Sequence, residues 1–421
     1  MSGPSAAPRR IVVGVGGGIA AYKSCSVIRH FTEAGHTVHV VPTEAALAFV
    51  GSATFEALSG NPVHTGVFAD VPAVPHVRLG QEADLVVIAP ATADLMARAA
   101  HGRADDLLTA TLLTARCPVM FVPAMHTEMW EHPATVENAA TLRSRGAVVV
   151  EPASGRLTGA DSGAGRLPDP GEICMLADLL LERPDAMPRD LEGVRMVVTA
   201  GGTREPLDPV RFLGNRSSGK QGYALARLAA QRGAQVTLIA AASTGLPDPP
   251  AVRVERIGTA AELESAVDAA AAEAEVVIMA AAVADFRPAA RADAKMKKGA
   301  DSEPDAVPLT RNPDILRGLV ARRGDGGLPA PRVIVGFAAE TGDADGDALH
   351  HGRVKLARKG CDLLVVNTVG DDRTFGLDSN DGWLLAADGA ERAIEHGSKS
   401  LMSSRILDAV TALLGDGHCR R

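Results

Sequence analysis

Residues 11–20 read IVVGVGGGIA, and residues 196–203 read MVVTAGGT. Each stretch joins a short aliphatic run to two or three consecutive glycines. An aliphatic run of this length is typical of a strand buried on both faces of a parallel sheet, and the glycines fit the tight turn into a following helix. The two stretches therefore predict two α/β units that begin in the same way.

The residues that follow each glycine turn extend this similarity between the two halves. Predicted helices end at Gly35 in the first half and at Gly233 in the second, and an aliphatic strand follows each of them. Short strands that alternate with alanine-rich helices indicate parallel sheets. We expect an α/β fold of two Rossmann-like three-layer units, with strands at 11–15, 37–41, 84–89, 119–122, 147–150, 195–199, 236–239 and 276–278.

A short segment, 182–193, separates the two halves. It carries Pro184 and Pro188 among mixed charges, which is typical of a linker. A chain of 421 residues would have about three domains at a typical domain size, but the repeat favours two. We therefore expect a first domain at 1–185, a linker at 186–193 and a second domain at 194–421.

The second half has extra residues directly after its first strand. Gly16 and Gly35 are 19 residues apart, whereas Gly201 and Gly233 are 32 residues apart. The 13 additional residues lie within 204–216. Because parallel sheets bind ligands at the carboxyl ends of their strands, we expect this insertion to contribute to a site.

The overall composition excludes several classes of protein. Lys and Arg total 43 against 51 Asp and Glu, and the net charge of −8 argues against a surface that faces nucleic acid or membrane. The 2 Trp, 2 Tyr and 9 Phe are too few for a base-stacking surface. The five cysteines form no C-x-x-C pair and no cluster with metal-ligand spacing. No apolar run approaches the roughly 18 to 20 residues that span a bilayer, so we expect a cytoplasmic protein.

The glycine turn of the first half is a candidate phosphate loop. It lacks the last glycine of a strict G-x-G-x-x-G pattern, and the second strand ends in Val41-Pro42-Thr43, with no acid to hold the ribose of NAD. These departures favour a mononucleotide over a dinucleotide. Small residues after the third strand offer a surface for a flat ring. FMN fits both features, with candidate contacts at Gly16, Gly17, Gly18, Ile19, Thr43, Ala91, Thr92, Ala93 and Asp94.

Longer motifs carry a resemblance to known families. The first half resembles flavin-containing cysteine decarboxylases in four features, which are 16–23, His76, 90–95 and 123–130. The second half resembles phosphopantothenate-cysteine ligases at 200–206, 215–220, 281–285 and 336–341. Together the motifs cover about residues 10–414 and are similar to the bifunctional phosphopantothenoylcysteine decarboxylase/phosphopantothenate-cysteine ligase family of coenzyme A biosynthesis. The resemblance implies a flavodoxin-like FMN domain followed by a CTP-dependent ligase domain.

For the first domain, the resemblance implies decarboxylation of 4'-phosphopantothenoylcysteine. FMN would oxidise the cysteine thiol to a thioaldehyde, which lets the carboxylate leave as CO2, and the enethiolate would then be reduced to the thiol. His76 matches the family's base for the thiol proton. Met125 and His126 match the segment that contacts the substrate carboxylate.

Two residues of the first domain depart from the family pattern. His126 stands where the family usually has Asn, and its ring can still donate a hydrogen bond. Gly159 stands where a flap commonly carries the cysteine that protonates the enethiolate. We expect a substitute donor, with Asp161, Thr158 or a water as candidates, and we select Asp161 as the candidate catalytic residue.

For the second domain, the resemblance implies that CTP with Mg2+ activates 4'-phosphopantothenate as an acyl-cytidylate, which cysteine then converts to the amide. Lys295 matches the lysine that stabilises the first transition state, and Asn215 matches the residue needed for the acyl-cytidylate and its attack by cysteine. Arg211 is a candidate for the substrate phosphate, and 215–219 also fits a helix cap ahead of Lys220. The remaining candidate contacts are Met279, Ala280, Ala281, Asp285, Asn312, Pro313, Asp314, Ile315, Phe337, Lys355 and Lys359.

Two other interpretations remain open. One half has lost its activity and serves as a nucleotide- or flavin-binding structural or regulatory domain, which Gly159 and His126 favour. The other is a nicotinamide-dependent oxidoreductase, against which Thr43 argues because it stands where an acid is expected. The resemblance also implies small-molecule substrates and a homo-oligomer with trimeric decarboxylase units and dimeric ligase units, up to a dodecamer.

Overall fold

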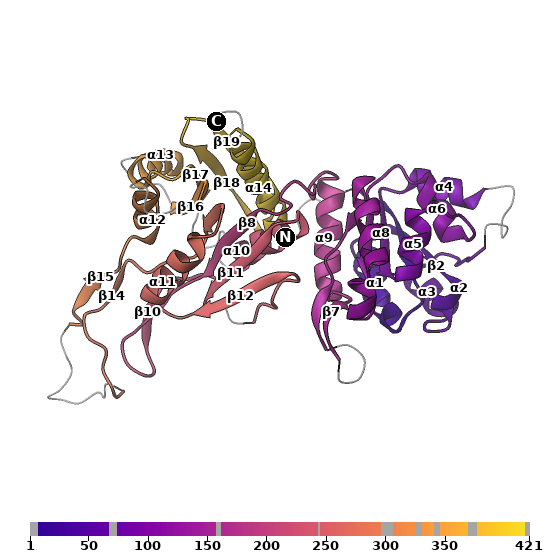
Figure 1. The fold of residues 1–421 in the computed structure, drawn as a ribbon, viewed down its shortest axis with the longest axis horizontal. Helices are drawn as coiled ribbons and strands as arrows, with labels where there is room; N and C mark the ends of the chain where they lie inside the picture. Colours follow the sequence, from indigo (N-terminus) through magenta and orange to yellow (C-terminus); the bar gives the residue numbers. More distant parts are fainter. Residues whose placement is uncertain are drawn as a thin grey trace. The chain divides into compact units, whose positions relative to one another are not determined.

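The structure is a computed structural model that describes residues 7–66, 74–156, 161–242, 245–295, 306–324, 331–340, 346–368 and 377–416. The chain divides into two compact units, Met1–Arg189 and Asp190–Arg421. The division falls inside the range 186–193 that the sequence analysis treats as a linker. Figure 1 shows a separate sheet with its own helices in each unit.

The N-terminal unit is built on a five-stranded parallel sheet in the order β2-β1-β3-β4-β5. Its strands are β1 (Arg10–Val15), β2 (Thr37–Pro42), β3 (Leu85–Ala91), β4 (Val119–Pro123) and β5 (Val148–Val149). After Arg10, every residue of β1 is buried, as expected of a central strand covered on both faces. The sheet is the predicted flavodoxin-like one, although β5 is shorter than the strand expected at 147–150.

Helices directly follow the first four strands of this sheet, β1 to β4. The glycine turn leads first into a short 3-10 helix, η1 (Ile19–Lys23), and only then into α1 (Ser24–Glu33). The other helices are α2 (Glu44–Leu47), α3 (Ser52–Ser59), α4 (Pro75–Glu82), α5 (Ala93–Ala100), α6 (Leu107–Thr114), α7 (Thr127–Trp130), α8 (Pro133–Ser144) and α9 (Pro170–Glu182). A hairpin of β6 (Ala153–Arg156) and β7 (Ser162–Arg166) precedes α9.

The C-terminal unit repeats this plan around a larger sheet in the order β12-β11-β8-β13-β16-β17-β18-β19. Its parallel strands are β8 (Arg195–Gly201), β11 (Gln235–Ala241), β12 (Val252–Ile257), β13 (Val276–Met279), β16 (Val333–Glu340) and β17 (Leu363–Thr368), and β18 (Ser379–Ala386) and β19 (Glu391–Ser398) run antiparallel. The run β11-β8-β13-β16-β17 matches β2-β1-β3-β4-β5 strand for strand. The predicted internal repeat is therefore confirmed in the topology.

Five helices and two small hairpins complete the described part of the C-terminal unit. The helices are α10 (Lys220–Gln231), α11 (Ala260–Ala271), α12 (Ile315–Gly324), α13 (Ala348–Lys359) and α14 (Lys399–Asp416). The 13-residue insertion forms most of one hairpin, β9 (Arg204–Pro206) with β10 (Phe212–Gly214), and the other hairpin is β14 (Phe286–Pro288) with β15 (Leu309–Arg311). The two hairpins are neighbours, since β9 contacts β14, and Figure 1 shows β10, β14 and β15 at the same side of the unit.

Each unit has its own aliphatic core. In the N-terminal unit, Val86, Ile88 and Leu95 pack with Phe121, and in the C-terminal unit Val277, Ile334 and Leu364 pack together. Beta-branched and leucine side chains fill both layers between sheet and helices, which explains how so few aromatic residues suffice. Among the described residues, no helix is long and apolar enough to cross a bilayer.

Candidate functional site

In the N-terminal unit, the candidate cofactor residues gather where β1 and β3 end. These two strands are neighbours, and the order β2-β1-β3 makes the gap between their carboxyl ends the point where the sheet's winding reverses. Parallel sheets of this order bind FMN at that point. The backbone N–H of Gly16 donates to the carbonyl of Pro90 at 3.0 Å, so the turn after β1 lies directly against the end of β3.

The glycines of this turn differ in what surrounds them. A Cβ on Gly16 would lie 2.5 Å from the Pro90 carbonyl oxygen, and one on Gly17 would lie 2.4 Å from the Cβ of Ala45. These two positions need glycine because the backbone packs closely. A Cβ on Gly18 would meet only Thr92 Cγ2 at 4.0 Å, so this position opens outward. The open face at Gly18 fits the approach of a phosphate, and the residues present therefore fit FMN.

Two threonines proposed as cofactor contacts also stabilise local helices. The Thr43 hydroxyl accepts the N–H of Ala46 at 3.2 Å and caps α2, and the Thr92 hydroxyl accepts the N–H of Leu95 at 3.3 Å and caps α5. Asp94 pairs with Arg98 at 3.1 Å on the first turns of α5. These contacts fix the two loops that flank the glycine turn.

The candidate substrate segment at Met125 and His126 lies beside the β6–β7 hairpin. The N–H of Met125 donates to the carbonyl of Gly165 at 2.9 Å, and Thr127 Oγ1 donates to the carbonyl of Ala164 at 2.7 Å. The segment also contacts β3, because the N–H of Ala124 donates to the carbonyl of Ala91 at 3.1 Å. The hairpin is thus anchored next to the end of β3, and Asp161, directly before its second strand β7, is exposed.

His76 lies on α4, which packs against α6. The hydroxyl of Thr114 donates to the His76 backbone carbonyl at 2.7 Å, and no hydrogen bond among the described residues joins His76 to the glycine turn. Its Nδ1 is buried and has no hydrogen-bond partner in the described part of the chain. Gly159 and Thr158 lie outside the described residues.

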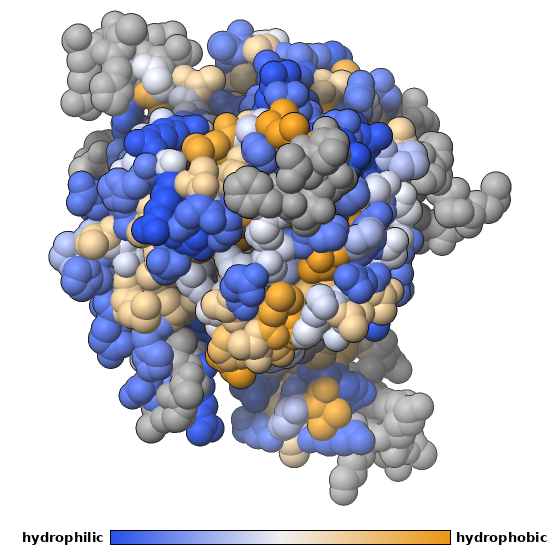
Figure 2. Space-filling model, turned by 90° about the vertical axis from the view of Figure 1, so that its right-hand side faces the viewer, coloured by the Kyte–Doolittle hydropathy of each residue, from blue (hydrophilic) through white to orange (hydrophobic). Residues whose placement is uncertain are grey.

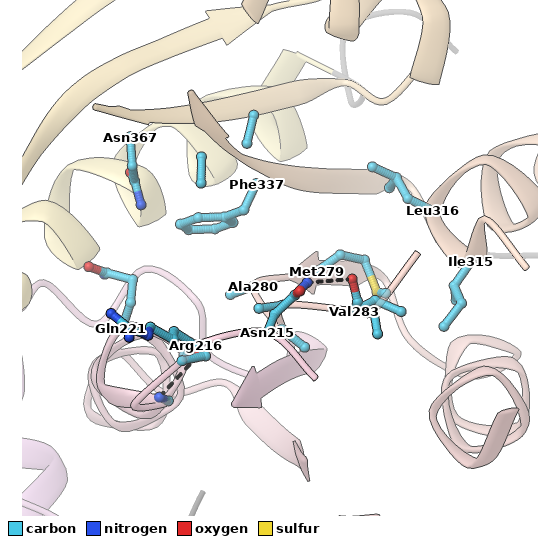
Figure 3. A pocket seen from close by; sticks show the side chains of 18 of the residues that line it. Asn215, Arg216, Gln221, Met279, Ala280, Val283, Ile315, Leu316, Phe337 and Asn367 are labelled. Atoms are coloured by element: carbon cyan, nitrogen blue, oxygen red, sulfur yellow. Dashed lines mark hydrogen bonds between the residues drawn. The ribbon is translucent and has the colours of Figure 1, made fainter. Parts of the chain in front are cut away.

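In the C-terminal unit, a cavity of about 450 Å³ lies at the carboxyl ends of the central strands. It brings together segments that lie as far apart in the sequence as the start of α10 and the start of α14. Most of the ligase residues predicted from the sequence line it: Asn215, Met279, Ala280, Ala281, Asp285, Asn312, Pro313, Asp314, Ile315, Phe337, Lys355 and Lys359. Figure 3 shows Asn367 and Phe337 projecting toward Gln221 and Asn215 from the other side of this cavity.

Two predicted ligase residues lie elsewhere. Arg211 is at the turn of the β9–β10 hairpin, where its guanidinium binds the buried carboxylate of Asp208 at 2.8 Å. Lys295 is exposed and is not among the cavity-lining residues. The structure of the single chain therefore does not bring either cation to the cavity.

The predicted helix cap at 215–219 is confirmed, and the residue that forms it is Gly219. α10 begins at Lys220, and its N-cap is Gly219, in the left-handed region at φ +72°, with no side-chain cap hydrogen bond. Asn215 instead donates from Nδ2 to the carbonyl of Val283 at 2.9 Å, as Figure 3 shows. Glycine adopts this backbone conformation without strain. The side chain of Asn215 does not cap the helix and lines the cavity.

Three lysines at the cavity are paired with acids. Lys355 Nζ lies 2.8 Å from Glu340 Oε1, Lys359 Nζ lies 2.6 Å from Asp314 Oδ2, and Lys220 Nζ lies 2.7 Å from Asp378 Oδ1. Burial raises the pKa of Asp314, but the hydrogen bond and charge of Lys359 outweigh it and hold the pKa below its usual value. These pairs place three lysine ammonium groups at the cavity.

Asn312 is held from several sides. Its Nδ2 donates to the carbonyl of Ala284 at 2.8 Å, and its Oδ1 accepts from the guanidinium of Arg287 at 2.8 Å. Its backbone N–H donates to the carbonyl of Asp285 at 2.8 Å. Asn312 therefore joins the base of the β14–β15 hairpin to the floor of the cavity.

Several residues of the cavity are not predicted from the sequence. Lys399 is 6% exposed and donates to the carbonyls of Leu377 and Ser379 at 2.7 and 3.3 Å. Burial lowers its pKa, as does the charge of Lys220. Asn367 is the residue before the last of β17, and its Oδ1 is buried with no partner among the described residues. The rule that ligands bind at the carboxyl ends of parallel strands points to Asn367, whereas no local signal marks Gln221, Asn380 or Lys399.

The sequence predicts no metal ligands, and the described part of the chain holds no cluster of them. Within the described ranges, no three His, Cys, Asp or Glu side chains come together as a metal site. The four described cysteines are free.

Known families and relatives match both units and nearly the whole chain. A family model described as DNA/pantothenate metabolism flavoprotein C-terminal domain matches residues 191–414, and one described as Flavoprotein matches residues 3–180. The coenzyme A biosynthesis bifunctional protein CoaBC of Mycolicibacterium smegmatis is 71% identical over 408 residues, which are 97% of this chain and 98% of the relative. That of Escherichia coli (strain K12) is 40% identical over 410 residues, 96% of this chain and 97% of the relative.

Solved structures match the two units separately. The C-terminal domain of a coenzyme A biosynthesis bifunctional protein CoaBC is 31% identical and covers 54% of this chain and 99% of its own, with a TM-score of 0.44. A PPC decarboxylase mutant complexed with pantothenoylaminoethenethiol is 28% identical and covers 42% of this chain and 99% of its own, with a TM-score of 0.39.

Proposed function

This chain belongs to the bifunctional coenzyme A biosynthesis proteins, and on that premise we propose how its residues carry out two consecutive reactions. It ligates cysteine to 4'-phosphopantothenate and decarboxylates the product, 4'-phosphopantothenoylcysteine, to 4'-phosphopantetheine. It is thus both a ligase and a lyase, and it is a flavoprotein that uses FMN. We assign ligation to the C-terminal unit and decarboxylation to the N-terminal unit.

The observation that carries the ligase assignment is the cavity at the ends of β13, β16 and β17. In the first step, a carboxylate oxygen of 4'-phosphopantothenate attacks the α-phosphorus of CTP, and pyrophosphate leaves. In the second step, the amine of cysteine attacks the acyl carbon, and CMP leaves. Lys355 and Lys359 hold the nucleotide's negative charge, and Asn215 binds the acyl-cytidylate while cysteine attacks.

Other candidate residues complete this assignment. The backbone at 279–281, the ring of Phe337 and the segment at Asn312, Pro313, Asp314 and Ile315 surround the nucleotide, with Asp285 beside them. Lys295 stabilises the first transition state and Arg211 binds the substrate phosphate, both from outside the cavity of one chain. Mg2+ enters as part of the MgCTP substrate, since this ion binds largely through phosphate oxygens.

In the N-terminal unit, bound FMN supplies the two-electron oxidation and re-reduction that let a carboxylate leave from an unactivated carbon. We assign removal of the thiol proton to His76 and binding of the substrate carboxylate to Met125 and His126. Asp161, exposed at the start of β7, returns a proton to the enethiolate. The flap that bears it is anchored beside Met125 through Gly165.

A single incubation tests both halves. The purified chain, yellow with FMN, is given 4'-phosphopantothenate, cysteine, CTP and Mg2+, and the products are identified by mass spectrometry. We expect 4'-phosphopantetheine, CO2, CMP and pyrophosphate. Accumulation of 4'-phosphopantothenoylcysteine would confine activity to the ligase and support the alternative in which the flavin unit only binds. No amide product would contradict the ligase assignment.

We place the reactions in the cytoplasm and propose a homo-oligomer of trimeric decarboxylase units and dimeric ligase units. Large apolar side chains are exposed in both units: Ile19 is 72% and Tyr22 60% exposed in the first, and Phe212 is 53% and Phe286 44% exposed in the second. Figure 2 shows apolar side chains at the surface of the N-terminal unit among hydrophilic ones. Exposed apolar groups of this size favour contacts between copies.

A further inference from the structure

The floor of the ligase cavity is formed by residues 279–285, which leave the sheet at the end of β13. Met279 still pairs with Thr199 of β8 in the regular ladder. Beyond that point the loop follows β8 through individual bonds: the N–H of Ala282 donates to the carbonyl of Gly201 at 2.8 Å, and the N–H of Thr203 donates to the carbonyl of Ala282 at 3.2 Å. The position of the floor therefore depends on the residues that continue β8.

Two threonine side chains replace the missing ladder bonds. Thr199 Oγ1 accepts the N–H of Ala281 at 3.0 Å, and Thr203 Oγ1 accepts the N–H of Ala284 at 3.0 Å. Both threonines are fully buried, with 0% exposure, so water cannot take over either bond. Neither lines the cavity, so neither touches what the cavity holds.

The bond from Thr203 reaches Asn215 through one peptide group. The N–H of Ala284 and the carbonyl of Val283 belong to the same peptide unit, which is planar and rigid. Thr203 Oγ1 holds the N–H end of this unit, and Asn215 Nδ2 donates to its carbonyl end at 2.9 Å. Rotation of the peptide would break both bonds at once. Figure 3 shows the Asn215 end of this connection.

The backbone of Asn215 is held against the same stretch of β8. A Cβ on Gly202 would lie 2.7 Å from the backbone carbonyl oxygen of Asn215, so the two backbones are in close contact. The main chain of Asn215 is thus placed by Gly202, and its carboxamide is placed by the peptide that Thr203 holds.

From this geometry we propose that Thr203 is a positioning residue for the second ligase step: its buried hydroxyl fixes the 283–284 peptide, which in turn orients the Asn215 carboxamide for the attack of cysteine on the acyl-cytidylate. The proposal rests on the role assigned to Asn215 above. Thr199 supports the same floor three peptide groups earlier, at the N–H of Ala281, without a link to Asn215. Misplacement of an orienting group by about 1 Å lowers a rate by up to about 100-fold.

The test compares Thr203→Val, which keeps the shape and removes the acceptor, with Thr203→Ser, which keeps the hydroxyl. Pyrophosphate release and amide formation are followed separately in the full-length enzyme. In Thr203→Val we expect amide formation to fall about 10- to 30-fold while pyrophosphate release and the KM for CTP change less than about threefold. Thr203→Ser should stay within about threefold of the unmodified enzyme for both steps.

The matched control is Thr259→Val. Thr259 Oγ1 also accepts a backbone N–H, that of Glu262 at 3.2 Å, at the start of α11, but Thr259 does not line the cavity. Loss of this hydrogen bond should lower the thermal midpoint of the C-terminal unit and leave both ligase steps unchanged. Decarboxylation of added 4'-phosphopantothenoylcysteine should be normal in all variants.

A double-variant cycle separates positioning from general stability. If Thr203 acts through Asn215, Thr203→Val should cost less than about twofold in amide formation when Asn215 is already Ala. An equal loss in both backgrounds, or a Thr203→Ser variant as slow as Thr203→Val, would overturn the proposal. Hydrogen exchange of the Ala284 amide gives a readout without activity: it should accelerate in Thr203→Val and not in Thr259→Val, and unchanged exchange also contradicts the proposal. Failure of the unmodified enzyme to form the amide would instead reject the proposed ligase function.

Discussion

The side chain of Asn215, a candidate catalytic residue, binds a residue that is distant in the sequence. The four residues after it include two serines and a glycine, and they predict a helix cap. In the structure, Gly219 caps α10 through its backbone conformation, and the Asn215 amide binds the carbonyl of Val283, 68 residues away. Because Gly219 caps α10, the side chain of Asn215 is not needed as a cap and lines the cavity instead.

Removal of the Lys359 charge should weaken nucleotide binding. In Lys359→Gln we expect the KM for CTP to rise about 10-fold, because one charge-assisted contact to the triphosphate or its neighbours is lost. The loss should also let the pKa of Asp314 return toward its usual value. Arg353→Gln is the matched control, since Arg353 pairs with Glu391 at 2.6 Å on the same helix and does not line the cavity. A normal KM in Lys359→Gln, measured by steady-state pyrophosphate release, would remove this lysine from the site.

The Lys359–Asp314 pair also has a defined pH dependence. The pKa of Asp314 is lower in the folded chain than its unfolded value of about 4. The stabilisation by this pair is therefore present above about pH 4 and is lost as the pH falls through the lowered folded value. It does not change near neutral pH.

The proton donor of the flap can be tested at Asp161. In Asp161→Asn, we expect more of the enethiolate to escape, as its thioaldehyde tautomer, before it is reduced, because the proposed donor is gone. Gly159→Cys should reduce this escape, since a thiol then stands at the position the family commonly uses. Release is measured by trapping the aldehyde, with Ser162→Ala as a neighbouring control. Unchanged partitioning in Asp161→Asn would remove this residue from the mechanism.

At the scale of elements, the 13-residue insertion in the second half forms most of a β-hairpin. β9 and β10 pair through Phe212 with Pro206 and Gly214 with Arg204, and Asp208 shapes the turn by accepting the N–H groups of Val210 and Arg211, both at 2.7 Å. Arg211 is thereby held at the tip and not in the cavity of its own chain. The sequence located the insertion correctly but did not show which way it projects.

A partly exposed ion pair between α1 and α9 predicts that the stability of the N-terminal unit depends on pH. His30 Nε2 lies 2.9 Å from Asp178 Oδ2, and this hydrogen bond raises the pKa of His30 although burial opposes it. The stabilisation is fully present below about pH 6.5, the unfolded value, and is lost as the pH rises through the raised folded value. The side chains are 38% and 43% exposed, so solvent limits the effect to below about 1 kcal/mol.

Thermal unfolding between pH 5.5 and 8.5 measures this contribution. The unmodified chain should lose stability across that range by more than His30→Gln or Asp178→Asn, and the two variants should behave alike. His101→Gln, at an exposed position after α5, is the control that keeps the pair. An identical pH dependence in all four proteins would show that the contact contributes nothing measurable.

At the scale of the whole molecule, the boundary between the units is marked on both sides. Arg189 binds Glu151 at 2.8 Å within the N-terminal unit, and the next residue, Asp190, binds the buried Arg232 within the C-terminal unit. The predicted linker is therefore anchored at adjacent residues. Each unit keeps its own core, and the chain repeats one strand order in both.

The proposed assembly makes a prediction for the intact protein. Twelve chains of 43.5 kDa would give a particle of about 520 kDa, built from trimeric and dimeric contacts. Light scattering measures this mass directly. Replacement of Phe286, 44% exposed, by Asp should break ligase contacts and leave trimers of about 130 kDa if it lies in a dimer interface. A monodisperse monomer in the unmodified chain would contradict the assembly.

The sequence by itself determined the fold class, the repeat and the edges of the sheets on which both sites lie. Aliphatic strands, glycine turns and caps are local signals, because strand burial and turn conformation act over a few residues. The order β2-β1-β3-β4-β5 and its copy follow from those signals and from the short right-handed connections of parallel sheets.

Only the tertiary structure decided which side chains meet. Lys399 and Asn367 enter the cavity from the start of α14 and from β17, far in sequence from the glycine turn, while Lys295 and Arg211 stay outside it. The hydroxyl of Thr203 acquired its role from a peptide more than 80 residues away. Such contacts depend on how distant strand ends come together, and a buried hydrogen bond of this kind leaves no periodicity or composition for the sequence to display.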